Sequence, residues 1–134
     1  MKAGKWIAIA LGAYVGLVVV FESLLGYFQP ASETTLVITT TNADGETNDR
    51  VLARIEVDDT LYVAVNHWPR AWYHATQANP RVHIKSPHED AAYNAVQITG
   101  AEYDKVNNAR ALGFGFRFLT GFPQRHILRL DPVE

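Results

Sequence analysis

The chain has 134 residues, a formal net charge of −2 and no cysteine. The small net charge and the lack of a basic stripe argue against a nucleic-acid partner. Without cysteine the protein has no disulfide, no thiolate metal site and no cysteine nucleophile, and its composition fits either redox compartment.

An apolar segment over residues 6–28 opens the chain, with Glu22 as its one charged residue. As a helix with a rise of ~1.5 Å per residue it would reach roughly 34 Å, enough to cross a hydrocarbon core of about 30 Å. We therefore predict a transmembrane anchor over residues 1–29. A cleaved signal peptide is the alternative, because a basic segment precedes the apolar run, but we find no small-x-small cleavage site before Pro30.

Charge at the two ends of this segment predicts its orientation. Lys2 and Lys5 precede the span, whereas Glu22 and Glu33 lie at its other end. By the positive-inside rule the amino terminus stays in the cytoplasm, and residues 30–134 form a periplasmic or extracytoplasmic domain of a single-pass membrane protein. Glu22 is tolerated in this arrangement because it lies near the carboxyl end of the span, close to water and head groups.

The remaining residues, 30–134, are enough for one domain with a single core. Their hydrophobic periodicity is mostly that of strands, joined at hairpin spacing. The six predicted strands are 35–40, 50–57, 61–65, 81–85, 92–99 and 126–130. A small antiparallel barrel with a few helices is the fold class that this pattern favours.

Two helices are predicted between the strands. One covers residues 70–78 and has a proline on each side. The other covers residues 101–112, where Thr99 and Glu102 have the spacing of a capping box and Gly113 follows as a terminator.

The strand-to-helix junction after residue 65 combines a cation with aromatic residues. The first amides of a helix carry partial positive charge, and Arg70 adds a forked donor for an anion. Trp68, Trp72 and Tyr73 supply flat apolar surface beside it. This pattern indicates a planar, phosphate-bearing cofactor, although Trp72 and Tyr73 would also serve to pack the short helix on the barrel.

Several segments resemble one known family. They are TLVITTTNADG, then RVLARIEVDDTLYVAVNHWPRAWYHATQANPRVHI, of which AWYHATQANPRV is the most specific part, and the closing LRLDP. This pattern resembles the deazaflavin-dependent nitroreductase family over most of residues 34–131. The resemblance implies a split β-barrel, here six-stranded and preceded by one transmembrane helix, that often forms a homodimer. It also implies hydride transfer from a deazaflavin coenzyme, while some relatives bind FMN-type flavin, haem breakdown products or fatty acids instead.

The resemblance also suggests site residues. Asn66 and His67 would face the coenzyme ring as candidate catalytic residues, with His67 as a proton donor near neutral pH. The other candidates are cofactor-binding Arg50, Arg54, Asn66, Trp68, Arg70 and Trp72, and substrate-binding Phe114, Phe116 and Phe118. The phenylalanines could instead rest on the bilayer surface, and the five histidines do not have the paired spacing of a metal site.

One turn departs from the family pattern. Asp44 and Glu46 follow the first strand at a place where relatives carry basic residues that meet the coenzyme's phosphate. Two carboxylates there would repel an anionic coenzyme by roughly 1 kcal/mol for each pair of unit charges at 4 Å in water. Arg50, Arg54 and Arg70 are the residues that would compensate, unless the two strand arginines point to solvent.

Two functions remain open from the sequence. The first is a membrane-anchored oxidoreductase that passes hydride from a deazaflavin coenzyme or FMN to a quinone or nitro acceptor. The second is a non-catalytic split-barrel module that binds a lipid, a quinone or a tetrapyrrole at the membrane. An accessory subunit of a membrane complex is a third possibility.

Overall fold

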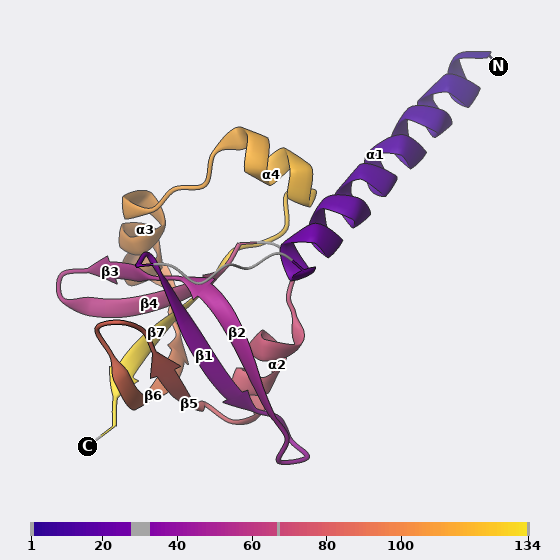
Figure 1. Ribbon diagram of the computed structural model, residues 1–134. Helices are drawn as coiled ribbons and strands as arrows, with labels where there is room; N and C mark the ends of the chain where they lie inside the picture. Colours follow the sequence, from indigo (N-terminus) through magenta and orange to yellow (C-terminus); the bar gives the residue numbers. More distant parts are fainter. Residues whose placement is uncertain (1, 28–32, 67, 134) are drawn as a thin grey trace.

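The computed structural model describes residues 2–27, 33–66 and 68–133. One long helix, α1, projects from a curled antiparallel sheet that carries three shorter helices (Figure 1). The helices are α1 (Lys2–Tyr27), α2 (Ala71–Ala78), α3 (Gly100–Ala109) and α4 (Phe114–Thr120). The strands are β1 (Thr35–Thr41), β2 (Thr47–Ala53), β3 (Ile55–Val57), β4 (Thr60–Val65), β5 (Arg81–Lys85), β6 (Asp90–Gln97) and β7 (His126–Pro132).

The sheet curls because its two edge strands are neighbours in the sequence. The strand order is β2-β1-β5-β6-β7-β4-β3, so β2 and β3 lie at opposite edges. Only Arg54 separates them, and a single residue cannot bridge a flat sheet of this width. The sheet therefore bends until its edges approach each other, and it forms a mainly β half-barrel.

The described chain has seven strands, so the prediction of six was wrong. We predicted one strand over residues 50–57, but it breaks at Arg54, whose backbone N–H donates to the carbonyl of Thr34 at 2.9 Å. Before the break β2 pairs with β1, and after it β3 pairs with β4. Hydrophobic periodicity continues across the break, which is why the sequence pattern did not reveal it.

The tight turn between β3 and β4 uses two aspartates where glycine is usual. Asp58 and Asp59 have φ angles of 50° and 61°, in the left-handed region. Aspartate tolerates this region better than most residues, and two consecutive left-handed residues match the twist of a hairpin. The predicted hairpin at this position is confirmed.

Both faces of the central strands are buried. Alternate residues of β7 point to opposite sides: Leu128 and Leu130 enter the core inside the curl, whereas Ile127 packs toward α3 with Val106. Each of these side chains is almost fully buried. The inner core is closed by α2, which inserts Trp72 as one of its buried residues.

The helix α3 does not use the predicted capping box. Thr99 is the N-cap but makes no side-chain capping bond, and the helix ends at Ala109, before Gly113. Glu102 instead accepts hydrogen bonds from the Tyr62 hydroxyl at 2.9 Å and from Arg129 at 2.7 Å. These tertiary partners hold the carboxylate away from the helix amides.

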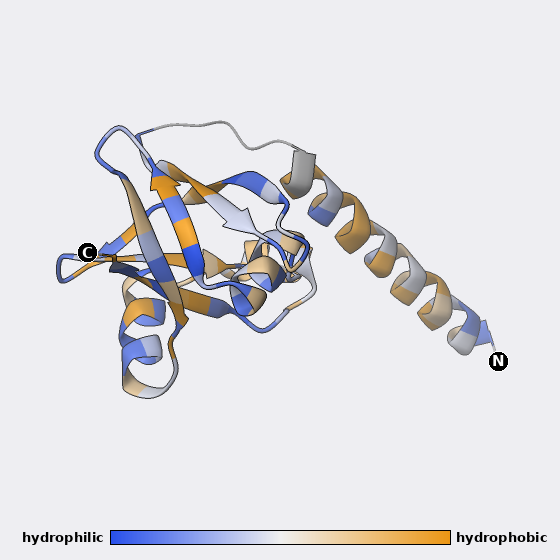
Figure 2. Cartoon of the chain, turned by 90° about the horizontal axis from the view of Figure 1, so that it is seen from below, coloured by the Kyte–Doolittle hydropathy of each residue, from blue (hydrophilic) through white to orange (hydrophobic). Residues whose placement is uncertain are grey.

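The carboxyl-terminal half of α1 packs on α4. The Tyr14 hydroxyl donates to the carbonyl of Phe118 at 2.8 Å, and the rings of Phe21 and Phe116 meet edge to face at 5.9 Å. The rest of α1 is exposed and, apart from Lys2 and Lys5 near its start, mostly apolar (Figure 2). Its segment Lys2–Leu25 is long and apolar enough to cross a membrane.

Candidate functional site

The junction between β4 and α2 places Arg70 against a carboxylate of α1. Arg70 Nη2 donates to Glu22 Oε2 at 2.9 Å and also to the Glu22 backbone carbonyl. The backbone N–H of Trp68 points at Glu22 Oε1 at 3.3 Å. Glu22 is only 8% exposed. A guanidinium and a backbone amide thus form the predicted anion site, and α1 fills it with its own carboxylate.

A second cation, Arg50 of β2, lies close to this pair. Burial and repulsion from Arg70 lower the pKa of the Arg50 guanidinium. Its Nε is buried and has no hydrogen-bond partner in the described part of the chain. A buried donor without a partner is costly, so Arg50 places an unsatisfied donor and a second positive charge beside Arg70. These two charges are what fits the phosphate-bearing cofactor that the sequence suggests, and Glu22 competes with it for Arg70.

Arg54 lies away from this cluster. It pairs with Glu89 at 2.5 Å and with Glu56 at 2.6 Å, at the corner where the sheet edges approach each other. Hydrogen bonds to these carboxylates raise its pKa and lower the pKa of Glu89. Arg54 therefore stabilises the corner where the two sheet edges meet. No interaction among the described residues joins it to the junction, so its role in cofactor binding stays a prediction.

The aromatic residues of the junction divide into exposed and buried ones. Trp68 is half-exposed, and its indole nitrogen lies beside Gly121. Trp72 is 4% exposed in the core, and Tyr73 stacks on His126 with ring centroids 4.9 Å apart. The packing role of Trp72 and Tyr73 is confirmed. The predicted catalytic residue His67 lies outside the described residues.

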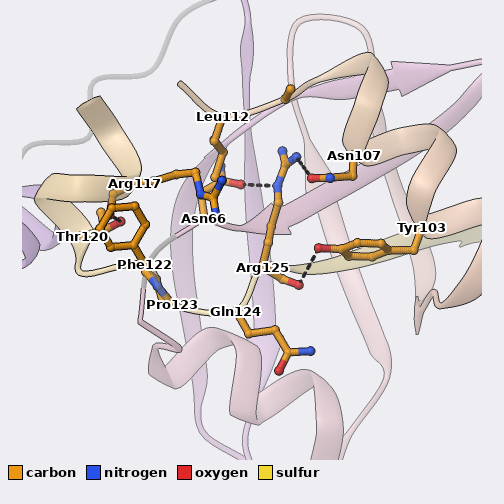
Figure 3. Close-up of a pocket in the computed structure, with 11 residues that line it drawn as sticks. Asn66, Tyr103, Asn107, Leu112, Arg117, Thr120, Phe122, Pro123, Gln124 and Arg125 are labelled. Carbon is orange, nitrogen blue, oxygen red and sulfur yellow. Dashed lines mark hydrogen bonds between the residues drawn. The ribbon is translucent and has the colours of Figure 1, made fainter. Parts of the chain in front are cut away.

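A cavity of about 450 Å³ lies beside Asn66, between the end of β4, the helices α3 and α4, and the segment that leads into β7 (Figure 3). Among the described residues, its lining includes two arginines and no acidic residue. The lining residues are Asn66, Tyr103, Asn107, Ala111, Leu112, Arg117, Thr120, Phe122, Pro123, Gln124 and Arg125. A cavity of this size suits a small organic molecule.

Arg125 forms the inner wall of this cavity, a role that the sequence did not predict, since it suggested only contact with lipid head groups. Its Nε donates to Asn66 Oδ1 at 2.8 Å, and its Nη1 donates to Asn107 Oδ1 and to the carbonyl of Arg110, both at 2.8 Å. Burial lowers its pKa, a shift that the nearby Tyr103 opposes. Its partners are far away in the sequence, so only its place directly before a predicted strand marked it.

The predicted substrate residues do not line this cavity. Phe116 packs on α1, whereas Phe114 and Phe118 are exposed and gather with Phe122, which does line it. The exposed fractions of Phe114, Phe118 and Phe122 are 73%, 40% and 46%. These three rings form an apolar patch, the phenylalanine patch, beside the mouth of the cavity.

Comparison with known families gives one match. The sequence profile of the F420H(2)-dependent quinone reductase family matches residues 18–112, from the last turns of α1 through α3. The chain belongs to this family, and the resemblance to deazaflavin-dependent reductases is confirmed. No curated protein matches the chain.

Solved structures share the fold. The heme storage protein HutZ from Vibrio cholerae aligns with a TM-score of 0.60 and 18% identity, over 77% of this chain and 84% of HutZ. The F420-H2 dependent reductase FDR-A aligns with a TM-score of 0.60 and 17% identity, over 78% of this chain and 100% of FDR-A. A domain-swapped dimer aligns with a TM-score of 0.61 and 14% identity, over 96% of this chain and 99% of its own. At these identities the likeness establishes the fold alone.

Proposed function

We propose that this member of the F420H(2)-dependent quinone reductase family is a membrane-anchored reductase that uses deazaflavin to reduce a quinone or a nitro compound. The observation that carries the proposal is the cationic cluster of Arg50 and Arg70 at the junction that leads to Asn66 and the cavity. The family and the FDR-A neighbour favour deazaflavin and give no support for FMN. When bound, deazaflavin supplies the hydride, so no side chain needs to react covalently.

The side chains and backbone of the protein would then bind the coenzyme and orient its ring. Arg50, Arg70 and the Trp68 amide would hold the coenzyme's phosphate, where Glu22 is the competing anion. Asn66 would direct its amide to the ring, since it follows β4 and lines the cavity. The role of His67 as proton donor stays a prediction.

The anchor brings the phenylalanine patch to the membrane. Tyr14 and Phe21 of α1 contact α4. If α1 crosses the bilayer, α4 lies at the membrane surface beside it, and the exposed rings of Phe114 and Phe118 meet lipid. A lipid-soluble acceptor would then reach the cavity past Phe122.

The domain division and the orientation belong to the same proposal: an anchor over residues 1–29, and a domain over residues 30–134 on the periplasmic side. The chain has no cysteine, so a single D44C variant gives one labelling site in the exposed β1–β2 turn. A membrane-impermeant maleimide should label D44C in intact cells. Labelling only after lysis would reverse the orientation.

Deazaflavin titration tests the reductase directly. The full chain in detergent should bind the coenzyme with saturable fluorescence quenching and should oxidise its reduced form with 2-methyl-1,4-naphthoquinone. Arg50→Met and Arg70→Met should each weaken binding about tenfold or more, the effect of losing a charge-assisted hydrogen bond. Arg81→Met, on the exposed surface of β5, is the matched control. Absence of quenching in the full chain would refute the deazaflavin function.

A non-catalytic binding module is the second candidate, because Glu22 already fills the anion position at Arg70 and the β1–β2 turn carries Asp44 and Glu46. Such a module would bind a quinone, a lipid or a tetrapyrrole without deazaflavin turnover. If the protein binds a quinone but does not oxidise reduced deazaflavin, the result would favour the binding module. A D44N/E46Q variant that gains deazaflavin affinity would identify the turn as the obstacle.

The homodimer that the family resemblance implies is also part of the proposal, and the fold likeness to a domain-swapped dimer supports it. Light scattering of the detergent-solubilised chain should give the mass of two copies. A single-copy mass would remove the dimer from the proposal.

A further inference from the structure

We propose that the cavity beside Asn66 binds a small, flat organic anion, an aromatic ring with an ionised oxygen such as a hydroxyquinone, and that Arg125 holds that oxygen. The binding itself does not depend on deazaflavin. As a choice of electron acceptor, it deepens the proposed reductase and rests on it.

The charge balance of the cavity is the first argument. Arg125 is only 8% exposed, and its three hydrogen-bond partners are neutral oxygens from Asn66, Asn107 and Arg110. A buried cation is expensive unless an anion accompanies it. None of the residues that line the cavity is acidic, and Arg117 adds a second positive charge at its edge. Arg125 therefore lacks a negative counter-charge among the described residues, and a bound anionic ligand can supply it.

Three less buried arginines, with side chains 21% to 32% exposed, provide a contrast. Arg54 contacts Glu89, Arg70 contacts Glu22, and Arg129 contacts Glu102 within 2.9 Å. In the described chain Arg125 makes no such ion pair. Each of these three arginines has a carboxylate partner, whereas Arg125 has none among the described residues.

The orientation of the guanidinium is the second argument. A guanidinium has five N–H donors, and Arg125 uses one on Nε and two on Nη1. No hydrogen bond within the described residues uses Nη2, so two donors remain for a ligand. The three bonds fix the plane of the group between Asn66 and Asn107 (Figure 3). A fixed, partly unused fork is suited to an oxygen anion.

The shape of the cavity is the third argument. Leu112, Phe122 and Pro123 give it apolar wall, while Asn66 and Asn107 lie beside the guanidinium of Arg125 (Figure 3). The guanidinium carbon of Arg117 also lies over the Phe122 ring, 5.7 Å from the ring centroid. A ring can lie on the apolar wall while its ionised oxygen meets the guanidinium. A long lipid tail would instead leave Arg125 without a counter-charge.

Equilibrium binding without deazaflavin tests the site. The probes are 2-hydroxy-1,4-naphthoquinone, which is anionic at neutral pH, and 2-methyl-1,4-naphthoquinone, which is neutral and of similar shape. The full chain in detergent should bind the anionic probe about tenfold or more tightly than the neutral one, measured by calorimetry. Arg125→Met should remove this preference, and Arg125→Lys should keep part of it. The exposed Arg81→Met should behave as wild type.

Equal affinity for the two probes, or a preference that survives Arg125→Met, would overturn the proposal. If Arg125→Met does not fold, Asn66→Asp decides the question, because it keeps Arg125 and supplies a carboxylate at its Nε. The Asn66→Asp variant should lose the preference for the anionic probe, and an unchanged preference would refute the proposal. This binding assay contains no deazaflavin, so a negative result refutes only the anion site and not the proposed reductase. A negative deazaflavin titration, in turn, refutes the reductase and not the anion site.

Discussion

Two arginines at neighbouring parts of the molecule are used in opposite ways. Arg70, at the start of α2, meets Glu22 of α1, whose carboxylate also receives the Trp68 amide. Arg125, before β7, meets only neutral oxygens and lines a cavity. The first arginine ties α1 to the sheet, and a phosphate bound there would compete with Glu22. The second arginine has no carboxylate partner among the described residues, which is why we propose that a ligand anion meets it.

The difference shows that a cation cannot be assigned to ligand binding by its position in a motif alone. Arg70 has the sequence context expected of an anion site, a strand end followed by a helix start. The fold nevertheless gives it a carboxylate from a residue 48 positions away. Arg125 has no recognisable motif, yet its burial without a counter-charge makes it the stronger candidate for direct contact with a small molecule.

The largest expected effect comes from removing the carboxylate at the paired arginine. Glu22→Ala removes the carboxylate that Arg70 and the Trp68 amide contact in a mostly buried position. Breaking such a pair should cost about 2 to 3 kcal/mol, below the range for fully buried pairs because Arg70 is partly exposed. Denaturant unfolding of the full chain in detergent measures the loss.

The adjacent Ser23→Ala is the matched control for Glu22→Ala, since the Ser23 hydroxyl bonds only a carbonyl of its own helix. It should change the free energy of unfolding by less than about 0.5 kcal/mol. If both variants lose the same stability, α1 is sensitive to any change at this position and the ion pair is not the cause.

A second paired arginine, Arg54, predicts a pH dependence. Hydrogen bonding to Arg54 lowers the pKa of Glu89 below its ordinary value of 4.5 in the folded protein. As the pH falls, the unfolded chain therefore takes up this proton first. The contribution of the pair, about 1 to 2 kcal/mol, is complete above pH 4.5 and is lost as the pH falls through the lower, folded-state pKa.

Glu89→Gln should be less stable than wild type at neutral pH, and the difference should shrink as the solution is acidified below pH 4.5. Unfolding free energies at several pH values measure it. A difference that stays constant with pH would mean that Glu89 stabilises the corner by packing or by neutral hydrogen bonds.

Asn66→Asp converts the unpaired arginine into a paired one. The new carboxylate replaces the amide oxygen that lies 2.8 Å from Arg125 Nε, so a neutral hydrogen bond becomes a charge-assisted one. The folded protein should gain about 1 kcal/mol of stability in the same denaturant assay. A loss of stability would indicate that Arg125 is already neutralised in the folded protein.

The smallest effect is expected at an exposed pair. Lys105 and Asp58 are in contact, but their side chains are 60% and 69% exposed. Lys105→Ala should therefore change the free energy of unfolding by less than about 0.5 kcal/mol. A larger change would show that proximity of charges, rather than burial, governs the stability of ion pairs in this protein.

The local elements follow from the sequence because their signals are local. The apolar run of α1, the alternation along the strands and the prolines around α2 each predict an element from adjacent residues. The break at Arg54 escaped this reasoning, since its cause is the partner change from β1 to β4. Sheet pairing is a long-range property that periodicity does not encode.

The sequence by itself determined the family, a mainly β fold, the apolar helix and the strand-to-helix junction before Arg70, but not the break that makes seven strands out of six. Only the tertiary structure decided which cations have counter-charges. Glu22 reaches Arg70 across 48 positions, and Asn66 reaches Arg125 across 59. The cost of a buried charge depends on burial and on neighbours in space, and both are set when the chain has folded.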